Sequence, residues 1–480
     1  MAATRFRRIA WICGGVLLAT MVALGALGFA FKMSFQPSAP ASHYPSPQST
    51  LEAQRQDLDY FSQLMELDRA FSSAQRAEAR SRLAALAASP QALPAPKLLV
   101  ALMQVMALAD NGHTRMEPSG PGALILPLRV TRFEDGFYVM RTTDSYRNLL
   151  GGRVESIDGK PWDEVLRQLD TLRGGVEGFR RSNSARWIVM QDLLFGLGIA
   201  SEAERSVWTV RLPDGAVVTQ TLTAYRDESG EWIPEDERWL SPEPVDGVEH
   251  DWVAERARSG EVPETWREWD KPFRVFPAGD GCTRVVRIQA IHDAGGQSLD
   301  DFLAATLTAF RAHPPCAVIL DLRGNGGGNY THTWGFAHAL PGLVAPGGHI
   351  SVLTDSLTFS AAITTEAFLK EAGGDRVSIV GEPVGDRLAF FSEGGKGCLP
   401  HLKACVFFQR GKHDYAQACT DWRQCFWLNW IYPVRVKTLQ PDVLVPLRFE
   451  DWDAGRDAAY QAAVNEASNS SASRKLGQAH

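Results

Sequence analysis

The stretch CAVILDLRGNGGGNY, residues 316 to 330, and the stretch HISVLTDSLTFSAAITTEAFLKEAGG, residues 349 to 374, decide how this sequence is interpreted. In each stretch a short apolar run containing β-branched residues comes before polar residues. This pattern predicts a buried strand that ends in a turn. The second strand is expected to lead into a helix that begins near residue 360 and runs to about residue 373.

The two predicted turns carry groups that suit acyl-transfer chemistry. Gly326, Gly327 and Gly328 can take positive φ and leave backbone N–H groups exposed, which forms a nest for an anionic oxygen. Ser360 stands at the start of the predicted helix, where free N–H groups and the helix dipole favour negative charge. An oxyanion formed by attack of this hydroxyl would therefore lie beside the Ala361 N–H and the glycine turn. The simpler interpretation is that Ser360 only caps the helix, since serine is favoured there.

The motifs D-L-R-G-N-G-G-G, residues 321 to 328, and T-F-S-A-A, residues 358 to 362, together resemble the core of the S41 serine peptidases. This group contains the tail-specific, C-terminal processing and tricorn-type proteases. The resemblance extends over about residues 90 to 465 and includes A-D-N-G-H-T at 109 to 114 and G-E-P-V-G-D-R at 381 to 387. It implies a ClpP/crotonase-like α/β core with Ser360 as nucleophile. It further implies an oxyanion hole formed by the N–H of Ala361 and of Gly326 or Gly327, with no cofactor and no metal.

A serine nucleophile needs a base within hydrogen-bond reach. In the tricorn-like branch of the family, the resemblance implies a histidine just after an N-terminal helix, and His113 matches that position. The other branch uses a lysine, at a position that holds Asp386 in this sequence. Lys370 is no substitute, because ten residues of helix place it about 15 Å from Ser360. The resemblance therefore implies Ser360 with His113.

A catalytic histidine normally has an acceptor that fixes its tautomer. The tricorn branch has a late glutamate for this purpose, but the residues before Pro441 contain no acid at that place. Glu393, in the sequence F-F-S-E-G-G, is the preferred candidate, and Asp386 and Asp110 are the alternatives. Each of them could also be a solvated acid of a turn.

Composition shifts and hydrophobic spacing divide the chain into seven segments. They are residues 1–35, a membrane anchor or signal segment; 36–50, a Pro/Ser linker; 51–114, a helical N-terminal segment with helices near 51–70, 73–88 and 95–109; 115–225, a small PDZ-like β domain; 226–275, a charged, Trp-rich connector or lid; 276–466, the S41-like catalytic domain; and 467–480, a disordered tail. The PDZ-like assignment depends on V-E-S-I-D-G-K-P-W-D-E-V-L, residues 154 to 166, which resembles the second half of a PDZ-type domain. A small β-roll that only packs on the core is the alternative.

The first residues predict the location of the chain. Arg5, Arg7 and Arg8 come before an uncharged apolar run from Ile9 to Phe31, whose 23 residues are long enough to cross the ~30 Å core of a bilayer. The basic flank predicts that the N-terminus stays in the cytoplasm. A cleaved secretory signal is the alternative. Both interpretations place most of the chain outside the cytoplasm, which means the periplasm in a Gram-negative bacterium.

Cysteine spacing and net charge narrow the possible classes of protein. Cys398, Cys405, Cys419 and Cys425 lie within 28 residues, which favours disulfides in an oxidising compartment. Pairing of neighbours is one of three connectivities that four cysteines allow, and a zinc site that includes His401 or His413 is the sharper alternative. Cys316 is expected in a buried strand. A net charge of -7 without a basic block argues against nucleic-acid binding.

The resemblance implies a serine peptidase that hydrolyses a peptide or protein substrate through an acyl-enzyme. One alternative is an esterase or other acyl hydrolase on the same core, because the chemistry of the nucleophile does not distinguish amide from ester. Another is an inactive relative that binds peptides with its PDZ-like part. The sequence does not specify the oligomeric state.

Overall fold

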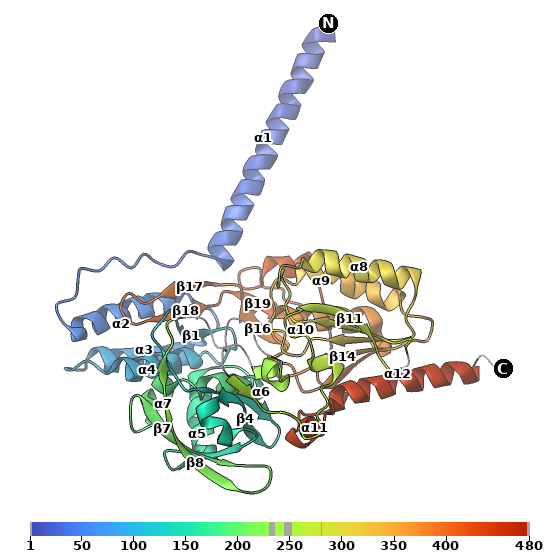
Figure 1. The fold of residues 1–480 in the computed structure, drawn as a ribbon. Coiled ribbons are helices and arrows are strands. Elements are labelled where there is room, and N and C mark those ends of the chain that lie inside the picture. Colours follow the sequence, from blue (N-terminus) through green and yellow to red (C-terminus); the bar gives the residue numbers. More distant parts are fainter. Residues whose placement is uncertain (1, 230–235, 244–251, 280, 478–480) are drawn as a thin grey trace.

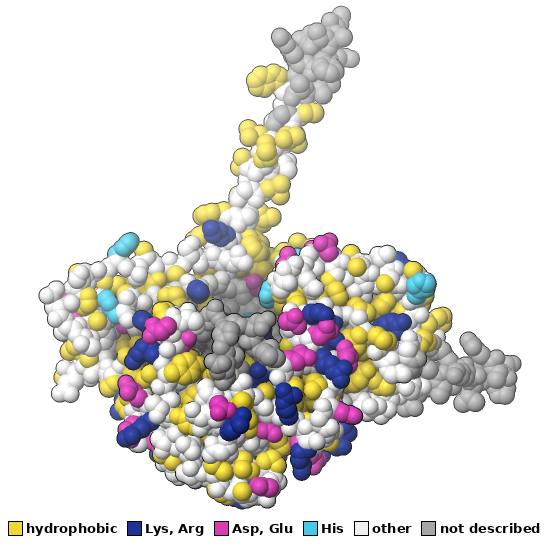
Figure 2. Space-filling model, in the orientation of Figure 1, with side chains coloured by type: hydrophobic (Ala, Val, Ile, Leu, Met, Phe, Trp, Pro, Cys, Tyr) yellow, Lys and Arg dark blue, Asp and Glu magenta, His cyan; other side chains and the backbone are white. Residues whose placement is uncertain are grey.

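The computed structural model describes residues 2–229, 236–243, 252–279 and 281–477. One long helix, α1 (Ala2–Phe35), stands out from the body of the molecule (Figure 1). The body combines N-terminal helices, a β-rich part and a core in which helices cover a sheet (Figure 1). Figure 2 shows hydrophobic side chains along α1, whereas acidic and basic side chains intermix over the visible face of the body.

The core is built on a six-stranded sheet in the order β11-β12-β13-β14-β15-β20. β11 and β12 are antiparallel, and the other neighbouring pairs are parallel. The strands are β11 (Phe273–Pro277), β12 (Arg284–Ile288), β13 (Val318–Asp321), β14 (Ile350–Thr354), β15 (Val377–Gly381) and β20 (Val443–Leu444). The predicted α/β class is confirmed.

Side-chain alternation along the strands buries both faces of this sheet. On β13, Val318 and Leu320 belong to one buried cluster, which also contains residues of α8 (Leu299–Ala312), α9 (Thr331–Ala339) and α10 (Ala361–Gly373). Ile319, between them, belongs to another cluster with Ala459 and Ala463 of α12 (Ala458–Gly477). The core therefore has three layers, with the sheet in the middle.

Helix α12 also corrects a prediction at the C-terminus. The segment 467–480 was expected to be disordered, but α12 is helical through Gly477. Between its start and Gly477 the helix contains neither proline nor glycine. Those residues are the strong helix breakers, so helix continuation is possible despite the polar composition.

The N-terminal helices are α2 (Thr50–Leu67), α3 (Ser73–Ala87) and α4 (Ala95–Ala107), within a few residues of their predicted ranges. The side chain of Ser49 caps α2, and Ser72 forms a capping box with Gln75 at the start of α3. These helices contact a small sheet in the order β1-β18-β17, made of β1 (Arg115–Pro118), β18 (Ala404–Phe408) and β17 (Gly395–Cys398). β1 was assigned to the PDZ-like segment, yet it pairs with a strand of the predicted catalytic domain.

The β-rich part contains a sheet in the order β10-β4-β5-β7-β8, with β3 beside β4 and β6 beside β5. Its strands are β3 (Leu128–Phe133), β4 (Gly136–Thr143), β5 (Arg153–Ile157), β6 (Lys160–Pro161), β7 (Arg205–Arg211), β8 (Val217–Thr223) and β10 (Trp252–Ala254). The accompanying helices are α5 (Trp162–Leu169), α6 (Glu177–Trp187) and α7 (Gln191–Gly196). Leu102 of α4, Val154 of β5 and Trp208 of β7 share one hydrophobic cluster, so this part and the N-terminal helices are packed together.

The segment predicted as a connector or lid, residues 226 to 275, is packed against the body where it is described. β10 pairs with β4, and Trp239 and Trp266 are buried in a cluster with Phe133 and Trp452. Residues 230–235, which include Trp232, and residues 244–251 lie outside the described part of the chain. Trp239 and Trp266 therefore cover hydrophobic side chains of the body.

Three disulfides are present: Cys282–Cys316, Cys398–Cys405 and Cys419–Cys425. The pairing of sequence neighbours among the last four cysteines is confirmed. The zinc alternative is wrong, because all four of its sulfurs are in disulfides. Cys316 does not lie in the strand as predicted, since β13 begins at Val318 and Cys316 bonds Cys282.

Candidate active site

The glycine turn after β13 and the turn before α10 are held together by backbone contacts. The Phe359 N–H donates to the Asn325 carbonyl at 2.9 Å, and the Thr358 hydroxyl donates to the Leu322 carbonyl at 3.0 Å. The Asn325 side chain donates to the Ile288 carbonyl and accepts from the Gly327 N–H at 2.9 Å. These bonds bring the glycine turn to the start of α10.

Gly327 touches Ser360 so closely that no larger residue fits. Its φ is +104°, and a Cβ added there would lie 2.5 Å from the Ser360 Cβ and 2.9 Å from the Ala361 N. Real Cβ atoms do not approach other atoms this closely, and this φ is also one that L side chains rarely adopt. Glycine is therefore required here by both the backbone conformation and the contact.

Ser360 has a strained backbone, with φ +55° and ψ -122°. It holds the N-cap position of α10, but its side chain forms no capping hydrogen bond. The simpler interpretation of Ser360 as a helix cap therefore does not fit this geometry. Non-glycine residues with positive φ are uncommon and concentrate at functional sites, where the surrounding structure holds them.

His113 is buried directly beside the turn that carries Ser360. Its ring stacks on Phe359, the residue before Ser360, with 4.2 Å between ring centroids. On the other side it stacks on Phe390 of β16 (Ala389–Ser392), at 5.3 Å. The structure thus places His113, the implied base, against the residue that precedes Ser360, the implied nucleophile.

Asp386 is the carboxylate next to this histidine. Its Oδ2 lies 3.5 Å from the His113 Nδ1, and both side chains are almost fully buried. Burial lowers the pKa of His113 below its ordinary value, although the nearby charge of Asp386 acts in the opposite direction. A histidine with a lowered pKa is neutral at pH 7 and can accept a proton.

Glu393, the preferred candidate for that acceptor, lies beside a different histidine. Its Oε1 is 3.7 Å from the Nε2 of His413, on β19 (Gly411–Asp414). Burial alone would raise the pKa of Glu393, but His413 and, more weakly, His113 hold it below its ordinary value. His413 stacks on Phe390 at 5.0 Å, so Phe390 separates it from His113.

Asp110, the third candidate, is engaged elsewhere. Its carboxylate forms an ion pair with Arg387 at 2.8 Å, and Arg387 also donates to the Asp110 carbonyl. The next residue, Asn111, donates to and accepts from the backbone of Phe391. We call these contacts the clasp. They hold the A-D-N-G-H-T turn, residues 109 to 114, against Arg387 and Phe391, and this places His113 against Asp386.

Gly326 and Gly327, the two glycines implied for the oxyanion hole, differ in hydrogen bonding and in exposure. The Gly327 N–H already donates to the Asn325 side chain, whereas Gly326 is exposed at the tip of the turn. The Ala361 N–H begins α10 directly after Ser360. Gly326 thus keeps an exposed backbone, while Gly327 is the glycine that lies against Ser360 and Ala361.

Comparison with known proteins shows a fold shared at low sequence identity. No protein-family model and no curated protein matches this sequence. Mature CPAF aligns over 86% of this chain and 96% of its own, with 16% identity and a TM-score of 0.52. Mature CPAF complexed with lactacystin aligns over 87% and 97%, with 15% identity and a TM-score of 0.54.

The chain has the fold of the S41 peptidases. The photosystem II D1 C-terminal processing protease also aligns, over 86% of this chain and 99% of its own, at 14% identity and a TM-score of 0.36. The fold implied by D-L-R-G-N-G-G-G and T-F-S-A-A is confirmed by the likeness to CPAF.

Two features of the site had no sequence signal. Phe359 and Phe390, which enclose His113, look like ordinary core residues, and nothing in the sequence indicates that they flank one ring. His413 is 300 residues from His113, and only the pairing of β16 with β19 brings it to the far face of Phe390. Asp386 was visible as a candidate, but no pattern ranked it above Glu393.

Proposed function

We propose that this chain is a serine peptidase of the S41 type that hydrolyses a peptide or protein substrate through an acyl-enzyme. One observation carries the proposal: Ser360 is held with positive φ and no capping bond, next to Phe359, whose ring stacks on the buried His113. A strained, uncapped serine beside a buried histidine is the arrangement that nucleophilic catalysis needs.

In the proposed reaction, the Ser360 hydroxyl attacks the carbonyl carbon of the scissile bond and His113 takes its proton. The Nδ1 of His113 faces Asp386, so the proton is accepted at Nε2 and the carboxylate stabilises the imidazolium. The oxyanion accepts hydrogen bonds from the Ala361 and Gly326 N–H groups. When the C–N bond breaks, His113 returns the proton to the leaving amine. Water then attacks the acyl-enzyme by the same route and releases the acid.

Asp386 replaces Glu393 as the proposed orienting residue. The contact of 3.5 Å with His113 belongs to Asp386, whereas Glu393 lies beside His413. Asp386 also occupies the position that holds a lysine in the other branch of the family. A carboxylate at that place supports a histidine base, because it favours the imidazolium that forms during attack.

The proposed location is outside the cytoplasm, with α1 as a membrane anchor. Residues Gly15–Phe35 of α1 are long and apolar enough to cross a membrane, although a signal sequence has the same properties. Three disulfides agree with an oxidising compartment. Both observations support an extracytoplasmic site of action.

The proposal is tested with a fluorophosphonate, which reacts only with an activated serine. The full chain in detergent is treated with the probe, digested and analysed for the modified peptide. We expect labelling at Ser360, none in Ser360→Ala, and labelling slowed about 10²-fold or more in His113→Ala.

Ser298→Ala is the matched control, because Ser298 is also an N-cap serine but its side chain does cap α8. It should lose about 1 kcal/mol of stability and keep full labelling. A folded wild-type protein that stays unlabelled would contradict the peptidase proposal and favour a peptide-binding protein. Labelling with turnover of esters but of no peptide would favour an acyl hydrolase.

A further inference from the structure

The end of α1 is seated on the catalytic core. Phe35 is fully buried, and its ring contacts Phe426 and Trp427 at centroid distances of 5.4 and 5.5 Å. Phe31, one turn earlier, contacts the same two rings at 5.3 and 5.9 Å. Arg410 donates to the Ser34 carbonyl at 2.8 Å. The helix therefore leaves the body in a defined direction.

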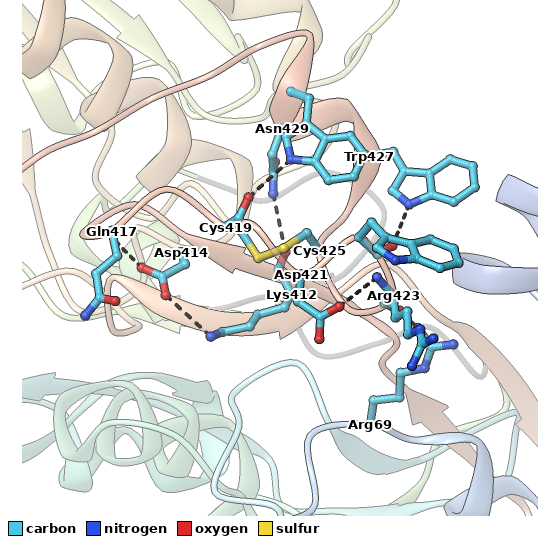
Figure 3. Close-up of a disulfide and its surroundings, with 12 residues drawn as sticks. Arg69, Lys412, Asp414, Gln417, Cys419, Asp421, Arg423, Cys425, Trp427 and Asn429 are labelled. Atoms are coloured by element: carbon cyan, nitrogen blue, oxygen red, sulfur yellow. Dashed lines mark hydrogen bonds and ion pairs between the residues drawn. A yellow bond between two sulfur atoms is a disulfide. The ribbon is translucent and has the colours of Figure 1, made fainter.

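The rings that contact α1 belong to residues 419 to 431, a short segment that begins with a disulfide-closed loop and that we call the tryptophan loop. Cys419–Cys425 closes it, and two backbone hydrogen bonds join Lys412 of β19 to Gln424 and Phe426. Figure 3 shows this disulfide, with Trp427 and Arg423 on one side of it and Lys412 and Asp414 on the other. These bonds make the loop a rigid part of the core.

The tryptophan loop exposes large apolar side chains. Trp422 is 58% exposed, Trp430 50% and Ile431 65%. The indole N–H groups of Trp427 and Trp430 donate within the loop, to the carbonyls of Trp422 and Cys419. Because these indole N–H groups already have acceptors, exposure to water gives the rings no further hydrogen bond. A cluster of exposed apolar side chains of this kind is typical of a contact surface.

The position of the tryptophan loop along the axis of α1 indicates which layer of a membrane the loop would contact. The apolar run from Ile9 to Phe31 has a length of about 34 Å, which fills the ~30 Å core of a bilayer and ends near Phe31. Lys32, the next residue, is exposed. Trp427 touches both Phe31 and Phe35, so the loop lies at the level where lipid meets water. Tryptophan is enriched at that level in membrane proteins, and Arg423, over the Trp422 ring at 5.5 Å, suits a headgroup phosphate.

We propose that the tryptophan loop lies in the headgroup region of the membrane that α1 spans. The catalytic body is then held on the lipid surface at two points, the helix and the loop. Two points of contact fix the distance of Ser360 from the membrane and the orientation of the body, whereas a single flexible tether would fix neither.

The test uses the full chain with Cys13→Ser, which removes the free cysteine among the described residues. Trp422→Cys is labelled with an environment-sensitive NBD group, without reductant, and the protein is reconstituted into phosphatidylcholine and phosphatidylglycerol vesicles. Quenching is measured with lipid that carries a nitroxide near the headgroup. Trp430→Cys repeats the measurement at a second site, so that disturbance by one label does not decide the result.

Two reference positions make the outcome decisive. Leu24→Cys, 62% exposed on α1, reports insertion of the helix, and Val217→Cys, 52% exposed on β8, reports a surface on the far side of the body from α1 (Figure 1). We expect quenching at residues 24, 422 and 430 that is several-fold stronger than at residue 217. Quenching at residue 24 without quenching at residues 422 and 430 would overturn the proposal. No quenching at any of the labelled positions would overturn it too. A blue-shifted emission at 422 without lipid quenching would overturn it as well, in favour of contact with a second copy of the chain.

Discussion

At the scale of single residues, the site depends on a contact that only glycine permits. We expect Gly327→Ala to reduce fluorophosphonate labelling by about 10²-fold or more, because the new Cβ would push Ser360 and the Ala361 N–H out of position. The labelling rate of the full chain measures this. Gly335→Ala is the control, since an added Cβ meets nothing within 4 Å there. Equal labelling of both variants would show that Gly327 does not position the nucleophile.

The lowered pKa of His113 predicts how the reaction depends on pH. The protonated histidine cannot accept a proton, so activity falls as the pH drops through the pKa of His113. Because burial depresses this pKa, we expect the midpoint of the acid limb below about 6.5, the ordinary value. The labelling rate between pH 4 and pH 8 measures the midpoint. A midpoint above the ordinary value would contradict a buried, neutral base.

Asp386→Asn should separate the two candidate acids. Removing the carboxylate takes away an effect that raises the pKa of His113, so the acid limb should move to lower pH. The plateau rate should fall by about 10² to 10⁴-fold, because the tautomer is no longer fixed. Glu393→Gln is the matched comparison and should cost less than about tenfold, since Glu393 lies beside His413. The reverse order of effects would restore Glu393 as the orienting residue.

At the scale of elements, the disulfides differ in the length of chain they close. Cys282–Cys316 has a sequence separation of 34 and joins the start of β12 to the start of β13. Cys419–Cys425 has a separation of 6. Removing the first pair, as Cys282→Ser with Cys316→Ser, should lower the free energy of unfolding by about 4 kcal/mol, and removing the second by about 2 kcal/mol. Denaturant unfolding of the two double variants checks the order, and equal losses would contradict the loop-length argument.

At the scale of the whole molecule, the proposed base His113 and the proposed nucleophile Ser360 come from parts of the chain about 250 residues apart. The hydrogen bonds of Asn111 to Phe391 hold the turn that carries His113. We expect Asn111→Ala to remove two hydrogen bonds to Phe391 and to lower stability by about 1 to 3 kcal/mol. It should also slow labelling, because His113 is no longer held against Asp386. Gln104→Ala, which removes an exposed hydrogen bond from α4 to Thr171, should do neither. A destabilised variant with an unchanged labelling rate would show that the clasp serves folding only.

The sequence by itself determined the parts that depend on neighbouring residues. Short apolar runs with β-branched residues and the glycine turn predicted β13, β14 and the strand-to-helix junction at Ser360, because such patterns act within one turn or strand. The disulfides between Cys398 and Cys405 and between Cys419 and Cys425 could also be predicted, since each joins residues close in the chain.

Only the tertiary structure decided which acid lies beside His113 and which chain segments share a sheet. From the sequence Glu393 was the preferred candidate and Asp386 and Asp110 were the alternatives. Which of them lies beside the imidazole follows from the contacts between two turns and from the pairing of β16 with β19. The same holds for Cys282 with Cys316, which meet because β12 and β13 are parallel neighbours. Contacts between distant segments depend on how whole elements pack, and no local pattern of residues carries that information.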